Sequence, residues 1–141
     1  MGTVQEDFIR SFLDAWGDGE SDPDSDTILA AFAEDAEWQL WVPGGPTLKG
    51  REAIGKDIER QLRFCNKMKC GLVSITSSDT QVITERHDTF VAGEVKVDHY
   101  LMAVYDLDES GRIKSWREYF DVGDVDRQLK AAKAVVPKVG T

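Results

Sequence analysis

The sequence predicts an α+β fold in which a strongly curved antiparallel sheet wraps over three N-terminal helices and leaves a cone-shaped cavity between them. Three observations support this prediction. Apolar residues follow mainly a helical period through the first 63 residues. From about residue 68 the period changes to two, which is typical of strands. Short turns join these later stretches and favour antiparallel hairpins, so helices precede an antiparallel sheet.

The N-terminal half of the chain predicts three helices and one strand. Residues 4–16 place their apolar side chains on one helical stripe. After a loop rich in Asp, Ser and Gly comes a second, short helix. AEWQLW at 36–41 alternates as a strand does, the stretch VPGGPTLKG is a loop, and residues 51–63 predict the third helix. The second helix carries three apolar side chains, Ile28, Leu29 and Phe32.

The C-terminal half predicts a meander of strands followed by one helix. The last helix is expected to begin after Asp121, and residues 130–141 are expected to form a loose tail. Because no repeat and no second domain is visible, the whole chain, 1–141, is expected to be a single domain. The expected strands are 68–77, 81–91, 95–107 and 112–120.

The composition excludes several classes of protein. The formal net charge of −9 argues against binding to nucleic acid or to an anionic membrane surface. No apolar run approaches the roughly 18 residues of a membrane span, and the acidic, amphipathic N-terminus is not a signal peptide. Cys65 and Cys70 with only two histidines do not form a zinc site. They are expected to be reduced thiols in a cytoplasmic protein.

Two predicted strands carry charge where apolar side chains are expected. Arg86 and Asp88 share a strand face with Phe90, and a buried charge is costly unless it is paired. In the strand 112–120 both faces mix charge with aromatic rings, so periodicity does not choose between them. If Trp116 and Phe120 face the cavity, Glu118 joins Arg86 and Asp88 there. Such a cluster is either a structural ion-pair network or a reactive site.

One histidine lies on an otherwise apolar strand face. His99 alternates with Val97, Leu101, Ala103 and Tyr105, so it is expected to point inward. An inward histidine is either a hydrogen-bonded core residue or a functional group in a pocket. His87 alternates away from Arg86 and Asp88 and is expected to point outward and to take no part.

The motifs VITERHD and GRIKSWREYFD resemble the limonene-1,2-epoxide hydrolase family, and FAEDAEWQ and KGREAI resemble earlier segments of it. This family is a branch of the cone-shaped superfamily of nuclear transport factor 2, ketosteroid isomerase and SnoaL-like cyclases. The similarity runs from about Phe8 to Leu129 and is densest over 82–121. The resemblance implies a six-stranded mixed sheet and a homodimer, whereas the residue pattern predicts five strands, the last four of them in a meander.

The resemblance also implies roles for individual residues. Asp88 matches the acid that protonates the epoxide oxygen, Glu118 matches an Asp that takes a proton from water, and Arg86 matches the Arg that bridges them. The family has a Tyr and an Asn that hold the water where this chain has Trp38 and Leu40. No metal, nucleotide or other cofactor is implied. The cavity wall expected here consists of Trp38, Leu40, His99, Leu101, Trp116 and Phe120.

The resemblance therefore predicts a one-step acid–base addition of water to a small, mostly apolar epoxide, which gives a diol. A second hypothesis is a SnoaL-like cyclase or a ketosteroid-isomerase-like enzyme that uses the same acid–base pair on a substrate with its own hydroxyl or acidic C–H. A third is a small-ligand-binding module without catalysis. Turnover of a panel of simple epoxides to diols separates the first hypothesis from the other two.

Overall fold

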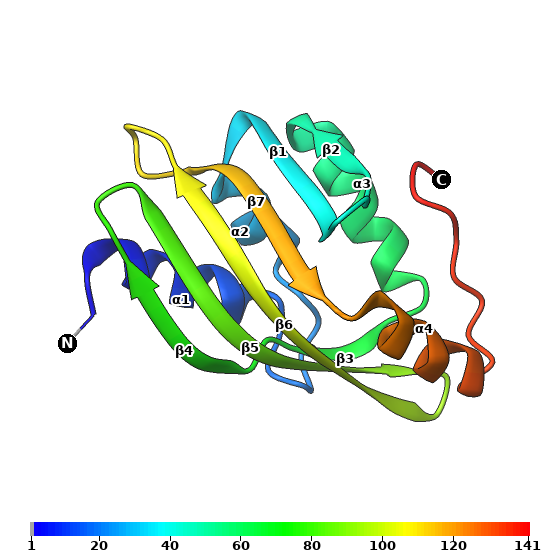
Figure 1. Ribbon diagram of the computed structural model, residues 1–141. Helices are drawn as coiled ribbons and strands as arrows, with labels where there is room; N and C mark the ends of the chain where they lie inside the picture. Colours follow the sequence, from blue (N-terminus) through cyan, green and yellow to red (C-terminus); the bar gives the residue numbers. More distant parts are fainter. Residues whose placement is uncertain (1) are drawn as a thin grey trace.

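A computed structural model describes residues 2–141 and shows one curved sheet with helices against it (Figure 1). The helices are α1 (Val4–Ala15), α2 (Ser25–Ala30), α3 (Gly50–Leu62) and α4 (Val122–Ala131). The strands are β1 (Phe32–Val42), β2 (Thr47–Lys49), β3 (Asn66–Lys69), β4 (Leu72–Ser77), β5 (Gln81–Ala92), β6 (Val95–Leu107) and β7 (Ile113–Phe120). The α+β prediction is confirmed.

The sheet is mixed, as the family resemblance implies. Its order is β2-β1-β7-β6-β5-β3, and β4 also pairs with β5. Strand β1 runs parallel to β7, while the other pairings are antiparallel. The meander predicted for the last four strands is confirmed, because β4, β5, β6 and β7 pair antiparallel in chain order through short turns. The whole sheet is not a meander, because β1 lies parallel to β7 at the far side of this group.

Residues 2–141 contain seven strands, where the residue pattern predicts five and the family resemblance implies six. Strand β1 begins at Phe32, which the pattern places in a helix, and β2 lies within the expected loop. The expected strand 68–77 is split at Gly71 into β3 and β4. A Cβ on Gly71 would lie 2.3 Å from the carbonyl oxygen of His87 in β5. The backbone between β3 and β4 therefore passes too close to β5 for a side chain at this position.

Side-chain caps fix where three of the helices begin. Thr3, Asp24 and Asp121 each accept a hydrogen bond from the backbone N–H three residues later, and so satisfy a free donor in the first turn of α1, α2 and α4. These residues are the short polar types that favour helix starts. The start of each of these three helices is therefore specified by a residue next to it in the sequence.

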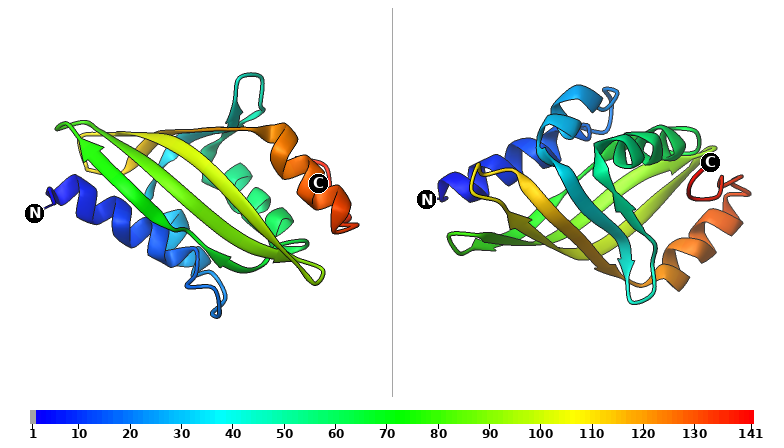
Figure 2. Two further views of the ribbon diagram at one scale, coloured as in Figure 1. Left: turned by 60° about the horizontal axis from the view of Figure 1, so that its bottom comes forward. Right: turned by 90° about the horizontal axis from the view of Figure 1, so that it is seen from above.

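The helices cover one face of the sheet and leave the other face open. Figure 2 shows α1 and α3 on the same side of the curved sheet. Phe12 of α1 packs edge-on against Phe32 and Trp116, with ring centroids 5.5 and 5.1 Å apart. This aromatic core fills one end of the space between sheet and helices. Among residues 2–141, no helix is long and apolar enough to cross a membrane.

The C-terminal residues lie against the body of the protein. Residues 130 and 131, at the start of the expected tail, still belong to α4. Further along, the Arg60 guanidinium donates a hydrogen bond of 3.0 Å from Nη1 to the carbonyl oxygen of Pro137. Val139 packs against the main hydrophobic core. The last residues of the chain thus form part of the wall described next.

Candidate active site

A cavity of about 410 Å³ lies between the sheet and the helices. Aromatic side chains from α1, β1 and β7 form one part of its wall, and α4 and residues 136–139 form another. Of the predicted wall, Trp38, Leu40, His99, Trp116 and Phe120 line this cavity. Leu101 is buried on the same sheet face but is not among the lining residues, so that expectation is corrected. It pairs with both Arg86 and Phe120 in the sheet.

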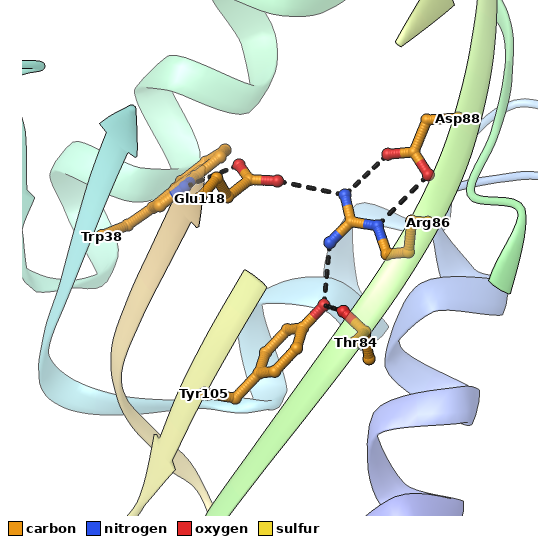
Figure 3. Close-up of polar contacts among 6 residues, drawn as sticks. All are labelled: Trp38, Thr84, Arg86, Asp88, Tyr105 and Glu118. Atoms are coloured by element: carbon orange, nitrogen blue, oxygen red, sulfur yellow. Dashed lines mark hydrogen bonds and ion pairs between the residues drawn. The ribbon is translucent and has the colours of Figure 1, made fainter. Parts of the chain in front are cut away.

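Arg86 lies at the centre of the polar part of the cavity (Figure 3). Its Nε and Nη2 donate to the two carboxylate oxygens of Asp88 at 3.2 and 2.6 Å. Nη2 also donates to Oε2 of Glu118 at 3.0 Å. Nη1 donates to the hydroxyl of Tyr105 at 2.8 Å, and that hydroxyl is 2.9 Å from Oγ1 of Thr84. The structure thus brings the predicted Arg86, Asp88 and Glu118 together, with Arg86 between the carboxylates.

The strand register explains how side chains from β5 and β7 meet across β6. Thr84 of β5 and Glu118 of β7 both pair with Ala103 of β6. Ala103 is fully buried on the same face, and its methyl group leaves room above it for longer side chains. Arg86 therefore reaches over the middle strand to Glu118. A large residue at position 103 would occupy this space.

The second oxygen of Glu118 is also held. The indole N–H of Trp38 donates to Oε1 at 3.1 Å. Trp38 pairs with Trp116 across the parallel strands β1 and β7, and the two indoles stack at 4.5 Å. The residue that replaces the family's Tyr therefore contacts the carboxylate itself. Leu40 lines the cavity two residues further along β1 and offers no hydrogen-bonding group.

The charges of this cluster do not balance, because one guanidinium faces two carboxylates. Burial raises the pKa of Glu118 to about 7, and the negative charge of Asp88 adds to this, although Arg86 works against it. Burial opposes the charge of Arg86, but Tyr105 and Asp88 raise its pKa above the ordinary value. Arg86 thus stays a cation. Near neutral pH the Glu118 carboxyl group therefore binds and releases a proton.

Other residues of the site escape prediction from the sequence. Tyr105 and Thr84 complete the hydrogen bonds of Arg86, and Arg60 and Cys70 line the cavity. Tyr105 shares the inward parity of His99, and a buried tyrosine hydroxyl needs a partner, so a signal for it exists in the sequence. His87 points away from the cavity, where its Nε2 lies 2.8 Å from Asp98.

A family model described as the limonene-1,2-epoxide hydrolase catalytic domain matches residues 4–131. The chain belongs to this family. Epoxide hydrolase EphG of Mycobacterium tuberculosis (strain ATCC 25618 / H37Rv) is a relative with 30% identity over 122 residues, which are 86% of this chain and 76% of EphG.

Two solved structures share the fold of this chain. The structure of an M. tuberculosis epoxide hydrolase that resembles this family has a TM-score of 0.74 at 26% identity, over 92% of this chain and 91% of that one. A putative polyketide cyclase from Xanthomonas campestris pv. campestris has a TM-score of 0.77 at 21% identity, over 89% of this chain and 96% of that one. The second likeness shows the fold alone.

Proposed function

We propose that the protein is an epoxide hydrolase that adds water to a small, mostly apolar epoxide in one step and releases a diol. The observation that carries the proposal is the position of Arg86, which holds carboxylates from two different strands in one cavity. Family membership supports it, and the motif resemblance assigns Asp88, Arg86 and Glu118 the roles of acid, bridge and base.

The proposed reaction needs a base and an acid at the same moment. Water is a poor nucleophile, so Glu118 takes a proton from it as its oxygen attacks a ring carbon. One C–O bond forms, the C–O bond of the ring breaks, and Asp88 gives a proton to the leaving oxygen. Return of a proton from Glu118 to Asp88 resets the site. No covalent intermediate is involved in this step.

One proton on the two carboxylates lets one of them act as acid and the other as base near neutral pH. Two carboxylates in a buried site resist joint ionisation. The raised pKa of Glu118 keeps a proton on this side chain up to about pH 7. The proposed reaction requires that this proton pass to Asp88, which leaves Glu118 ionised and able to act as the base. Arg86 contacts both carboxylates in either arrangement. A well-placed acid or base contributes about 10²–10⁴ in rate.

The wall of the cavity supports a substrate with little polarity. Trp16, Trp38, Leu40, Trp116 and Phe120 line it. The volume of about 410 Å³ lies within the ordinary range for small-molecule sites. Each oxygen of Glu118 already accepts one N–H, but a carboxylate oxygen accepts a second donor, so an attacking water still has a place.

A panel of small epoxides tests the proposal. Purified protein in ¹⁸O-labelled water is expected to convert at least one of them to a diol that carries one labelled oxygen from the first turnover onward. The Glu118→Gln variant serves as the control. If the diol of the first turnover is unlabelled and the label appears in the protein, an ester intermediate has formed. This result contradicts direct attack by water. Absence of diol from the whole panel overturns the proposal.

One observation favours a second candidate, a cyclase that uses the same acid–base pair. Leu40 offers no group to hold water, and a substrate with its own hydroxyl needs no water. Such an enzyme converts a hydroxy-epoxide to a cyclic ether instead of a triol. Restoring the family pair with Trp38→Tyr and Leu40→Asn is expected to raise epoxide hydrolysis if the missing amide limits it. A fall in hydrolysis instead shows that water is held elsewhere.

We further propose that the protein is a homodimer, as the family resemblance implies, through the open face of the sheet. Tyr100 and Met102 on this face are 61% and 50% exposed, and Val104 is half-buried beside them. Sedimentation at micromolar concentration is expected to give the mass of two chains, and Met102→Lys is expected to weaken the dimer. The mass of one chain for the unaltered protein refutes this.

A further inference from the structure

His99 carries a polar atom that the fold leaves without a partner. Its Nε2 is buried and makes no hydrogen bond to any other atom of residues 2–141. The same side chain lines the cavity. Buried polar atoms in folded proteins are nearly always paired, so an exception in the wall of a cavity marks a place where a ligand completes the bonding.

The strand register places His99 on the side of Asp88 and far from Glu118. His99 pairs directly with Asp88 across β5 and β6. Glu118 pairs instead with Ala103, four residues further along β6 and roughly 13 Å away at 3.3 Å per residue. Side chains of directly paired residues start about 5 Å apart. The backbone of His99 is therefore closer to the proposed acid, Asp88, than to the proposed base, Glu118.

The surroundings of His99 keep its imidazole neutral. Burial lowers its pKa to about 4, and Arg86 acts in the same direction, against Asp88 and Asp124. The ring packs edge-on against Phe120, with centroids 4.3 Å apart. A neutral imidazole has one donor and one acceptor nitrogen and is no strong acid at neutral pH. It is suited to recognising a neutral polar group.

We propose that His99 is a specificity-determining residue that hydrogen-bonds an oxygen substituent, a hydroxyl or a carbonyl, on the epoxide substrate. The inference rests on the proposed function, because Asp88 is taken to contact the ring oxygen. Since His99 and Asp88 are direct neighbours, the recognised group lies one or two bonds from the epoxide ring. The substrate class is then a small α-oxygenated epoxide, apolar on the side that meets Leu40 and Phe120.

A matched pair of epoxides tests this. The first is 2,3-epoxycyclohexanol, and the second has a methyl group in place of its hydroxyl. We expect the unaltered protein to turn over the hydroxy-epoxide with a kcat/KM about tenfold higher, the factor expected from one neutral hydrogen bond. His99→Leu is expected to lower kcat/KM for the hydroxy-epoxide alone, so that the ratio of the two kcat/KM values falls close to one. His99→Gln, which keeps an amide donor and acceptor, is expected to restore part of it.

A binding measurement makes the test independent of turnover. In the Glu118→Gln protein, which retains His99, calorimetry is expected to show about tenfold tighter binding of the hydroxy-epoxide, and the added His99→Leu change is expected to abolish this difference. If neither epoxide yields diol but this difference is present, the proposed function fails and the recognition by His99 stands. Equal affinities of the two epoxides for a protein that binds both, or an equal loss on both in His99→Leu, overturn the inference.

Discussion

Two buried arginines line the same cavity, and their partners differ. Arg60 of α3 donates from Nε and Nη2 to Asp57, and its Nη1 donates to the carbonyl oxygen of Pro137. Arg86 of β5 is held by two carboxylates, Asp88 and Glu118. The Arg60 pair has one negative charge for one positive charge. The Arg86 cluster has one carboxylate too many for neutrality.

This difference in charge separates a structural site from a reactive one. In a balanced buried pair the two opposite charges compensate each other, and the pair serves to hold its neighbours in place. In the unbalanced cluster, burial raises the pKa of Glu118 to about 7, and the charge of the second carboxylate, Asp88, adds to this rise. The number of carboxylates around each buried arginine therefore distinguishes the two sites, whereas the presence of an ion pair does not.

The largest expected effect is on catalysis at the unbalanced cluster. Glu118→Gln keeps the shape but removes the base, and Asp88→Asn removes the acid. Each change is expected to lower kcat for diol formation by about 10²–10⁴. Since both groups act in one step, the double variant is expected to be hardly slower than either single one. Diol formation that survives Glu118→Gln shows that Glu118 is not the base, and steady-state kinetics measure this directly.

The next effect is on stability, and here the balanced pair is expected to be the more sensitive. Asp57→Asn leaves the buried Arg60 without a counter-charge and is expected to lower the free energy of unfolding by about 3–5 kcal/mol. Glu118→Gln is expected to cost less, because Arg86 still has Asp88. Urea denaturation of both variants measures the two values. A larger loss for Glu118→Gln contradicts the comparison.

The third effect is the dependence of stability on pH. The folded protein keeps the proton of Glu118 up to about pH 7, whereas the unfolded chain releases it near the ordinary value of 4.5. The stabilisation of the folded state by the protonated Glu118 is therefore fully present below about pH 4.5 and is lost as pH rises to about 7. The loss is on the order of 3 kcal/mol. Subtracting the profile of Glu118→Gln from that of the unaltered protein isolates it, and a flat difference refutes the raised pKa.

The smallest effect is a shift in the pH dependence of kcat/KM when the indole of Trp38 is removed. Because the active pair carries one proton, kcat/KM is expected to fall tenfold per pH unit above about pH 7. The N–H of Trp38 lowers the pKa of Glu118, so Trp38→Phe is expected to move this fall to higher pH by less than about one unit. Asp57→Asn should leave the position of the fall unchanged. A rate that rises through pH 7 to a plateau shows that the pair needs no proton.

Parts of the site that depend on local parity are readable from the sequence. Arg86 and Asp88 are two residues apart in one strand, so their shared face follows from the chain alone. The fold class is readable for the same reason, since the change of period from helix to strand is local. The resemblance adds the mixed sheet and the role of Glu118, whose own strand has two ambiguous faces.

Contacts between distant strands are not readable in this way. The hydrogen bond from Trp38 to Glu118 depends on parallel pairing of β1 with β7, and nothing near either residue specifies that pairing. The short strands β2 and β3 lack enough residues to show a period. The absence of Leu101 from the cavity wall depends on the packing of its neighbours and not on its parity.

The end of the chain has a practical consequence for laboratory work. The family model ends at residue 131, yet Val136, Pro137, Lys138 and Val139 line the cavity. A purification tag fused after Thr141 is therefore attached two residues from the cavity wall. The start of α1 lies at the opposite end of the molecule (Figure 1). Kinetic and ligand measurements on this protein call for a tag at the N-terminus.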